Sequence, residues 1–390
     1  MIDRDAAQTI STLLRGFPIV TLTGPRQSGK TTLAKALFKD RPYASLEDPD
    51  LRQAAMDDPR SFLGRYPDGG VLDEVQRCPD IISYLQTMVD ADGRMGLYIL
   101  TGSQQFGLMS KITQSLAGRT GFVELLPFSI PELAKAHKLP ESADTMLLNG
   151  CYPPLYDRKL QPSSWFGAYV TAYVERDVRQ LLKVHELETF QRFVRLCAGR
   201  TGQLLNLSSL ATECGITHNT AKSWISVLEA SYLIFLLRPH HASLGKRLVK
   251  MPKLYFYDVG LVSWLLGMRA PEQIETHPLR GSIFETFIIS ELMKSWLNRG
   301  EKPAFSFWRD SNGNEVDLIF EQGSKLMPIE IKSGKTIARD SFTGLERWCT
   351  LAGKAVMEPT LIYGGSESYQ HKGIRVLGWQ KCGELLYGLR

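Results

Sequence analysis

The segment at residues 19–32 constrains this chain more than any other. Residues 19–23 are apolar or β-branched, residues 24–31 read G-P-R-Q-S-G-K-T, and residues 33–38 contain helix formers and no breaker. A strand, a loop of the form G-x-x-x-x-G-K-T and a helix in this order make the phosphate-binding P-loop. The sequence therefore predicts that this segment binds a nucleoside triphosphate.

The residue types in the loop suit phosphate binding. Gly24 and Gly29 let the backbone turn tightly and bring its N–H groups against phosphate oxygens, beside the positive end of the new helix. Lys30 places a charge on the β- and γ-phosphates, and the Thr31 hydroxyl is expected to bind Mg²⁺. ATP and Mg²⁺ are thus the expected cofactors. The predicted nucleotide contacts are Gly24, Pro25, Arg26, Gln27, Ser28, Gly29, Lys30, Thr31, Thr32 and Asp73.

Acidic and polar residues follow two further apolar stretches. Asp73 and Glu74 end the stretch at residues 69–75, as a Walker B site requires. Asp73 is expected to hold Mg²⁺, and Glu74 to orient and polarise the attacking water. At the tip of the stretch at residues 97–101, Ser103 or Gln104 is expected to contact the γ-phosphate or the water; a polar loop is the alternative.

Strands that alternate with helices predict a parallel sheet covered on both faces, with ligands at the carboxyl ends of its strands. The order of P-loop, Asp-Glu strand, polar strand tip and arginine before a fifth strand resembles the AAA+ ATPase core. The resemblance implies that Arg119 reaches the γ-phosphate of a neighbouring subunit, in a ring for which a hexamer is one arrangement. A guanidinium stabilises charge on the transferring phosphoryl group. The alternatives are that Arg119 caps a helix end, or that Arg176 is the arginine that reaches the nucleotide. For Arg176, a place on a solvated helix face or in a salt bridge is the alternative role.

Nearly the whole chain resembles one prokaryotic family, in which an AAA-type domain opening with G-P-R-Q-x-G-K-T is joined to a C-terminal domain of unknown function. Further matches are residues 118–119, 126–129 and 175–177. The fold class implied is α/β. The expected domains are an AAA+ ATPase core with a parallel sheet at residues 1–130, a helical lid at 131–200, a winged helix at 201–270 and an α/β nuclease-like domain at 275–390.

Residues 207–230 predict two helices around the tight turn at residues 215–217, which is typical of a helix-turn-helix. The second helix would face DNA, and the basic stretch at residues 230–257, which lacks Asp and Glu and includes Lys253, would follow phosphates. The alternative is a module that binds protein. The predicted DNA contacts are Asn219, Thr220, Lys222, Lys246, Arg247 and Lys250.

A second constellation of charged residues lies near the carboxyl terminus. Asp317 and the E-x-K of Glu330 and Lys332 fall on a predicted hairpin, downstream of a helix that contains Glu285. The pattern resembles the PD-(D/E)XK nuclease superfamily, although Val316 stands where that superfamily often has proline. The resemblance implies that Asp317 and Glu330 bind Mg²⁺, that Lys332 positions or deprotonates water, and that Glu285 assists. An ordinary cross-strand charge cluster is the alternative.

Composition limits the cellular compartment and the kinds of partner that the chain is expected to have. The six cysteines include no C-x-x-C pair, which argues against a structural zinc site or a disulfide framework. No signal-peptide pattern or membrane-spanning apolar run is present, so we expect a cytoplasmic protein without a membrane partner. The formal net charge of +5 permits an anionic partner.

Together these features favour an ATP-hydrolysing AAA+ motor that engages DNA, with branched or junction DNA as one option. A nucleotide-dependent regulatory switch that acts on protein partners is the first alternative. An ATP-gated, metal-dependent DNA nuclease is the second. Stimulation of ATP turnover by DNA would distinguish the motor from the switch, and metal-dependent nicking would identify the nuclease.

Overall fold

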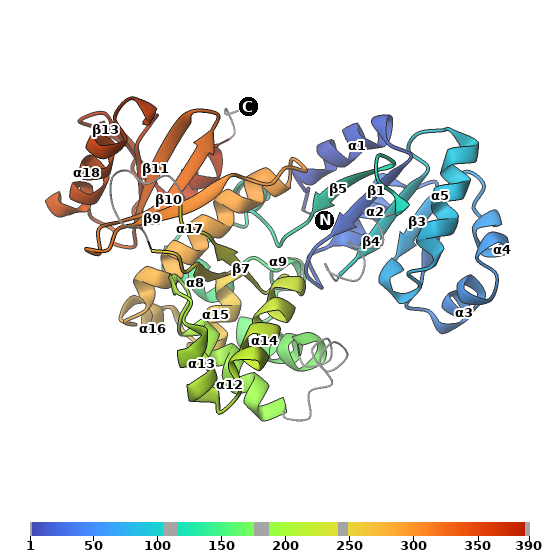
Figure 1. Ribbon diagram of the computed structural model, residues 1–390, viewed down its shortest axis with the longest axis horizontal. Helices are drawn as coiled ribbons and strands as arrows, with labels where there is room; N and C mark the ends of the chain where they lie inside the picture. Colours follow the sequence, from blue (N-terminus) through green and yellow to red (C-terminus); the bar gives the residue numbers. More distant parts are fainter. Residues whose placement is uncertain (1, 104–114, 175–186, 241–248, 387–390) are drawn as a thin grey trace. The chain divides into compact units, whose positions relative to one another are not determined.

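The computed structural model describes residues 2–103, 115–174, 187–240 and 249–386 (Figure 1). The chain forms two compact units. The first comprises Met1–Phe128, Ala230–Tyr232 and Trp296–Glu301, and the second comprises Ser129–Glu229, Leu233–Ser295 and Lys302–Arg390. Most of the segments expected to be lid, winged helix and nuclease-like domain thus fall in one unit, and the finer division into four domains stays a prediction.

The first unit contains a five-stranded parallel sheet with the strand order β2-β3-β4-β1-β5. Every residue of β1 and β4 is buried, as expected of a parallel sheet covered on both faces. The predicted α/β fold with a parallel sheet is therefore confirmed. The strands are β1 (Ile19–Thr23), β2 (Tyr43–Ser45), β3 (Gly70–Asp73), β4 (Tyr98–Gly102) and β5 (Thr120–Glu124).

Alternating side chains of these strands enter two different cores. Val20, Leu22 and Ile99 pack with residues of α1 (Ala6–Gly16) and α2 (Lys30–Leu37). Ile19 and Leu100, from the same two strands, pack with residues of the helices that follow β2 and β3. These helices are α3 (Pro49–Asp57), α4 (Pro59–Gly64) and α5 (Ile81–Asp92), with the 3₁₀ turn η1 (Val75–Arg77) between β3 and α5.

The first part of the second unit is mainly helical and contains the predicted helix-turn-helix. Asn206 caps α13 by accepting a hydrogen bond from the Ser209 N–H, and Gly215 ends that helix with a φ of 71°. A three-stranded sheet, with one strand before and two after these helices in the chain, has the order β6-β8-β7. The helices are α7 (Ile130–Lys135), α8 (Ala143–Asn149), α9 (Pro153–Asp157), α10 (Pro162–Tyr169), the π-helical turn η2 (Val170–Val174), α12 (Leu187–Ala198), α13 (Leu207–Cys214), α14 (His218–Ala230), α15 (Val259–Leu265) and α16 (Pro271–Glu275); the strands are β6 (Gln203–Leu204), β7 (Ile234–Leu237) and β8 (Lys253–Phe256).

The rest of the second unit is built on a mixed sheet with the order β13-β14-β12-β11-β10-β9. The predicted hairpin is present, since β10 pairs antiparallel with β11. The strands are β9 (Phe305–Arg309), β10 (Glu315–Gln322), β11 (Lys325–Lys332), β12 (Thr360–Tyr363), β13 (Tyr369–His371) and β14 (Ile374–Gly378); the helices are α17 (Arg280–Leu297), α18 (Thr343–Ala352) and the 3₁₀ turns η3 (Arg339–Phe342), η4 (Gly353–Ala355) and η5 (Trp379–Glu384).

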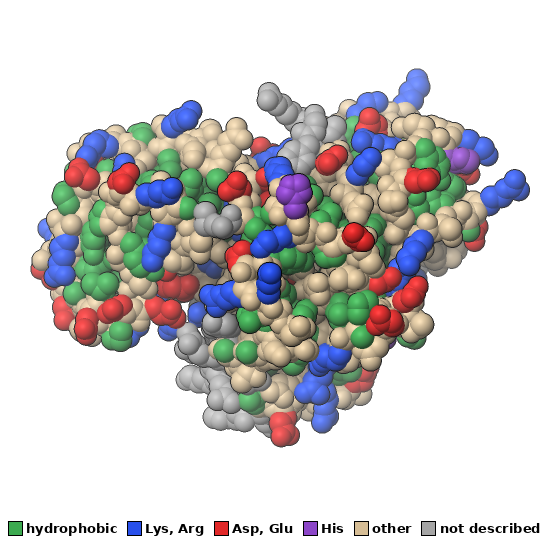
Figure 2. All heavy atoms as spheres, turned by 180° about the vertical axis from the view of Figure 1, so that it is seen from behind, with side chains coloured by type: hydrophobic (Ala, Val, Ile, Leu, Met, Phe, Trp, Pro, Cys, Tyr) green, Lys and Arg blue, Asp and Glu red, His purple; other side chains and the backbone are tan. Residues whose placement is uncertain are grey.

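Charges of both signs are interspersed over the face of the molecule drawn in Figure 2. Among the described residues, no helix is both long enough and apolar enough to cross a bilayer.

A buried carboxylate joins distant segments of the second unit. Asp258 caps α15 by accepting a hydrogen bond from the Leu261 N–H at 3.1 Å, and it also accepts one from the Cys151 N–H at 2.7 Å. Its side chain is buried. Buried N–H groups that lose their acceptor are costly, so Asp258 should contribute strongly to the stability of this unit.

Asp258→Ala is expected to lower the free energy of unfolding by about 2–4 kcal/mol, because two buried N–H groups lose their acceptor at about 1–3 kcal/mol each. Urea unfolding followed by tryptophan fluorescence measures the change. Gln161→Ala is the matched control, since Gln161 precedes α10 without a side-chain cap and is exposed. Equal stability of the two variants would contradict this role for Asp258.

Candidate nucleotide site and carboxylate cluster

The P-loop lies at the carboxyl end of β1, and its backbone requires glycine at two positions. Gly24 has a φ of 143°, and a Cβ there would lie 2.2 Å from the Leu125 carbonyl oxygen. Gly29 has a φ of 94° and directly precedes α2. Ser28 Oγ is buried and has no hydrogen-bond partner in the part of the chain that the structure describes, so the loop presents a polar atom that suits a phosphate ligand.

Lys30 is held by the loop itself. Its Nζ donates hydrogen bonds to the carbonyl oxygens of Gly24 at 2.9 Å and Pro25 at 2.7 Å, and its side chain is buried. The ammonium therefore lies against the backbone that would surround a phosphate chain. Phosphate oxygens would offer it stronger, charge-assisted acceptors than these carbonyls.

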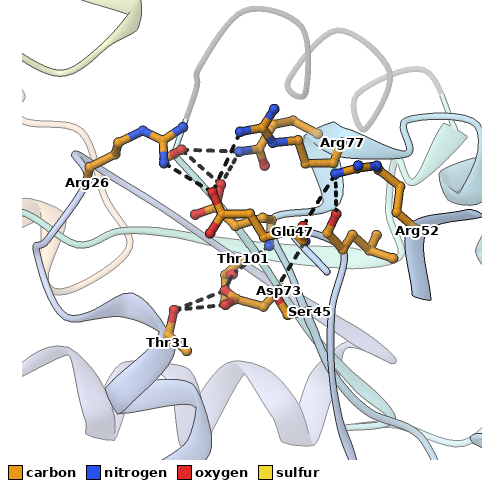
Figure 3. A network of polar contacts seen from close by, with 12 residues as sticks. Arg26, Thr31, Ser45, Glu47, Arg52, Asp73, Arg77 and Thr101 are labelled. Carbon is orange, nitrogen blue, oxygen red and sulfur yellow. Dashed lines mark hydrogen bonds and ion pairs between the residues drawn. The ribbon is translucent and has the colours of Figure 1, made fainter. Parts of the chain in front are cut away.

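Asp73 is the centre of a hydrogen-bond network at the end of β3 (Figure 3). Thr31 Oγ1 lies 3.1 Å from both carboxylate oxygens, Tyr43 donates from its hydroxyl at 2.7 Å, and Thr101 donates to Oδ1. Burial and the Asp73 carboxylate raise the pKa of Tyr43, which keeps its hydroxyl protonated. The structure thus brings the predicted Mg²⁺ ligands Thr31 and Asp73 together. Tyr43 was not predicted, because only the pairing of β2 with β3 places it there.

Glu74 and Ser103 also meet at this edge of the sheet. Glu74 has a left-handed backbone, with φ 58° and ψ 43°, and its N–H donates to Thr101 Oγ1. Ser103 Oγ donates to Glu74 Oε2 at 3.1 Å, and Gln76 Nε2 donates to both Ser103 Oγ, at 3.1 Å, and Glu74 Oε2. Gln76 is therefore a member of the site that the sequence did not indicate. Gln104, the other candidate at this strand tip, lies outside the described residues.

Arg26 of the P-loop faces a carboxylate of its own unit (Figure 3). Glu47 Oε1 lies 3.8 Å from Arg26 Nη1 and 3.6 Å from Arg77 Nη2. Arg77 belongs to the turn that follows Glu74, so two guanidinium groups from the two nucleotide motifs share one acidic partner.

Arg119 lies at the other edge of the sheet. The Ile19 N–H donates to its carbonyl oxygen, which places it at the amino ends of β1 and β5, whereas the P-loop follows their carboxyl ends. Five residues of strand span roughly 16 Å. The Arg119 guanidinium donates hydrogen bonds to the Asp90 carboxylate at 2.5 and 2.8 Å and to the Ala117 carbonyl oxygen at 3.0 Å. Arg176 lies outside the described residues.

The predicted DNA contacts are only partly available on the surface. Asn219 and Lys222 are exposed on one face of α14, and Lys250 is exposed as well. Thr220 is half-buried, and its hydroxyl shares a hydrogen bond of 2.8 Å with that of Thr217. Lys246 and Arg247 lie outside the described residues.

The nuclease-like residues form one group of interacting charges. One carboxylate oxygen each from Glu285 on α17 and from Glu315 and Asp317 on β10 lie within 4.8 Å of one another. Glu330 pairs with Lys332, Oε1 to Nζ at 2.6 Å, and its buried Oε2 has no hydrogen-bond partner among the described residues. Glu315 was not predicted, although its spacing of two residues from Asp317 places both on one face of a strand.

A lysine from β8 lies among these carboxylates. Lys253 Nζ donates to Glu285 Oε1 at 2.9 Å and pairs with Glu315, and the Tyr255 hydroxyl donates to the same Glu285 oxygen at 2.5 Å. Lys253 is only 2% exposed. The expectation that it follows DNA phosphates is wrong, because its charge is buried in an ion-pair network.

Burial and neighbouring charges shift the pKa values of several of these residues. Burial favours the neutral amine, but the neighbouring carboxylates outweigh it and raise the pKa of Lys253 above its ordinary value. Burial and the adjacent Asp317 carboxylate raise the pKa of Glu285 to about 7 and that of Glu330 to about 8. A divalent metal bound by the Glu285 cluster would have to displace the Lys253 ammonium from Glu285 and Glu315.

Three family models match the chain in succession. "AAA domain" matches residues 16–134, "Domain of unknown function (DUF8612)" matches residues 140–272, and "Domain of unknown function (DUF4143)" matches residues 280–382. Among solved structures, a Walker-type ATPase of Pyrococcus abyssi is 14% identical, with a TM-score of 0.45, over 68% of this chain and 96% of that one. AMPPCP-bound DnaA from Aquifex aeolicus is 17% identical, with a TM-score of 0.30, over 57% of this chain and 85% of that one.

Two curated relatives resemble the chain over most of its length. Uncharacterised proteins of Mycobacterium bovis and Mycobacterium tuberculosis are each 30% identical over 336 residues, which cover 85% of this chain and 74% of theirs. Together with the two outer family models, this similarity settles the membership. The chain belongs to the family of these mycobacterial proteins, P-loop ATPases in which an AAA domain is joined to a C-terminal domain of unknown function.

Proposed function

We propose that the chain is a Mg²⁺-dependent ATPase that works as an oligomer and couples ATP hydrolysis to the engagement of DNA. One observation carries the proposal: the P-loop, the Thr31–Asp73 pair and the Glu74–Ser103 pair converge at the carboxyl ends of neighbouring strands. Parallel sheets bind ligands at this edge.

Thr31 and Asp73 are the residues that would hold Mg²⁺. Both offer hard oxygen ligands, and few protein ligands suit an ion that also binds phosphate. Bound Mg²⁺ neutralises charge on the phosphates. Lys30 would exchange the carbonyl oxygens of Gly24 and Pro25 for phosphate oxygens, and Ser28 Oγ would gain a partner.

Glu74 is the proposed general base. Its carboxylate is positioned by Ser103 and Gln76, and a left-handed backbone at a glutamate persists only where surrounding contacts hold it. The carboxylate would accept a proton from the water that attacks the γ-phosphate. Ser103 and Gln76 would act by positioning that carboxylate.

Arg119 is proposed to serve a neighbouring subunit. The length of β1 separates it from its own P-loop, so it cannot contact a nucleotide bound there. In a ring, of which a hexamer is one form, the amino edge of one sheet would face the next nucleotide. The guanidinium would leave Asp90 for the γ-phosphate.

The DNA part of the proposal rests on α14. Asn219 and Lys222 lie exposed near the start of the second helix of a helix-turn-helix, where such helices contact bases and phosphates. Branched or junction DNA remains one option. The ATP-gated nuclease is the weaker alternative, because Lys253 already pairs with two carboxylates of the nuclease-like group.

Lys30→Ala is expected to weaken ATP binding about 10- to 100-fold, because a hydrogen bond to a charged group is worth about 1.5–3 kcal/mol. Glu74→Gln should bind ATP normally but hydrolyse it about 10²- to 10⁴-fold more slowly, as expected when a general base is lost. Calorimetry and phosphate release measure the two effects. Lys39→Ala, at an exposed lysine just after α2, is the control. Turnover at the parent rate in Glu74→Gln would remove Glu74 from its role.

Arg119→Ala is expected to slow turnover about 10³-fold if the arginine acts between subunits. Mixing this variant with Glu74→Gln should restore part of the activity, since an intact base and an intact arginine then meet at some interfaces. Arg94→Ala is the control, because Arg94 also forms exposed ion pairs, with Asp68 and Asp92. Parent-like turnover in Arg119→Ala would contradict the proposal.

Lys222→Ala is expected to weaken the binding of duplex and four-way DNA and to lower the slope of log K against log salt by about one, as loss of one phosphate contact should. Lys354→Ala, at an exposed lysine of η4, is the control. Fluorescence anisotropy over a salt series measures both. Absence of DNA binding at low salt, with ATP turnover unaffected by DNA, would refute DNA engagement and favour the regulatory switch.

A further inference from the structure

The carboxylate cluster of the second unit is assembled from three segments that are distant in sequence. Glu285 comes from α17, Glu315 and Asp317 come from β10, and Lys253 comes from β8. Oxygen atoms of the three carboxylates lie within 4.8 Å of one another, a spacing that would suit a shared cation. Three acidic groups so close together repel one another strongly unless a positive charge lies between them.

Lys253 supplies that positive charge. Its Nζ is 2.9 Å from Glu285 Oε1 and also pairs with Glu315, and its side chain is 3% exposed. Tyr255 lies two residues further along β8, and its hydroxyl donates to the same Glu285 oxygen at 2.5 Å. One strand therefore provides both donors to this carboxylate.

Other partners bond several of the remaining oxygens. Glu315 Oε2 pairs with Arg309 at 3.0 Å, Asp317 Oδ2 accepts a hydrogen bond from the Ile331 N–H at 2.8 Å, and Glu330 Oε1 pairs with Lys332. Mg²⁺ requires near-octahedral oxygen ligands at about 2.0–2.1 Å. The Lys253 ammonium already bonds two of the three carboxylates that could supply them.

We propose that the ammonium of Lys253, and not a divalent metal, is the resident cation of this carboxylate cluster, which thereby acts as an internal clasp that fastens β8 to α17 and β10. The nuclease-like arrangement is then a structural ion-pair network, and a divalent cation can enter only when the lysine is removed. This inference does not depend on the proposed ATPase mechanism.

Lys253→Met tests the clasp in the full chain without nucleotide. In EDTA, the melting temperature of the variant should fall by about 10 °C, because removal of one partner leaves buried charges unpaired. Mn²⁺ should restore much of this loss, and electron paramagnetic resonance should count one more bound Mn²⁺ per chain than in the parent. The additional Mn²⁺ should be absent from the double variant Lys253→Met/Glu315→Gln. Lys381→Met, at an exposed lysine, controls for the change of residue type.

The parent chain gives the opposing test, which holds even if Lys253→Met fails to fold. If Lys253 is the cation of the cluster, Glu315→Gln lowers the melting temperature by the same amount in EDTA and in Mn²⁺. If a metal ion is bound there instead, Mn²⁺ raises the melting temperature of the parent, and Glu285→Gln and Glu315→Gln each abolish that increase. The second result would overturn the inference.

Discussion

The nucleotide site depends on the carboxylate of Asp73. It accepts hydrogen bonds from Thr31 on the P-loop helix, Tyr43 on β2 and Thr101 on β4, so one side chain joins the helix to three adjacent strands. A buried carboxylate is stable only when donors surround it. The parallel sheet supplies them because the carboxyl ends of its strands meet at one edge. The same edge brings Glu74 and Ser103 together. The strand ends that surround Asp73 therefore also position the residues of the proposed chemistry.

The second unit uses buried charge for a different purpose. On α17, Glu285 pairs with Lys253, and Glu291 pairs with Lys294 at 2.5 Å, with both members of the second pair almost fully buried. Such pairs add little net stability compared with apolar contacts, but breaking one of them is costly. The Glu285–Lys253 pair therefore ties α17 to β8, whereas the Glu291–Lys294 pair lies within α17 itself. The carboxylates around Glu285 resemble a metal site, but in the proposed arrangement they fasten α17 by pairing with Lys253.

The sequence predicts the site best where a motif is local. The P-loop, the Asp-Glu strand end, the helix-turn-helix and the C-terminal hairpin all lie where their patterns indicate, because strand and helix periods and glycine positions are properties of short segments. The neighbours of those motifs are harder to predict. Tyr43 reaches Asp73 only through strand pairing, and Gln76 reaches Glu74 only through the turn that follows β3. The prediction for Lys253 was wrong. Its place in a basic stretch suggested a DNA contact, but its carboxylate partner Glu285 lies 32 residues further along the chain, where only the fold brings the two together.

The first unit is proposed to bind Mg²⁺ and ATP together at the edge of the sheet where Asp73 lies. Calorimetric titration of the folded chain with ATP, in Mg²⁺ and then in EDTA, tests this binding. Saturable binding of one nucleotide per chain is expected, and it should be markedly weaker without the metal. Absence of binding heat in Mg²⁺, from protein shown by circular dichroism to be folded, would contradict it.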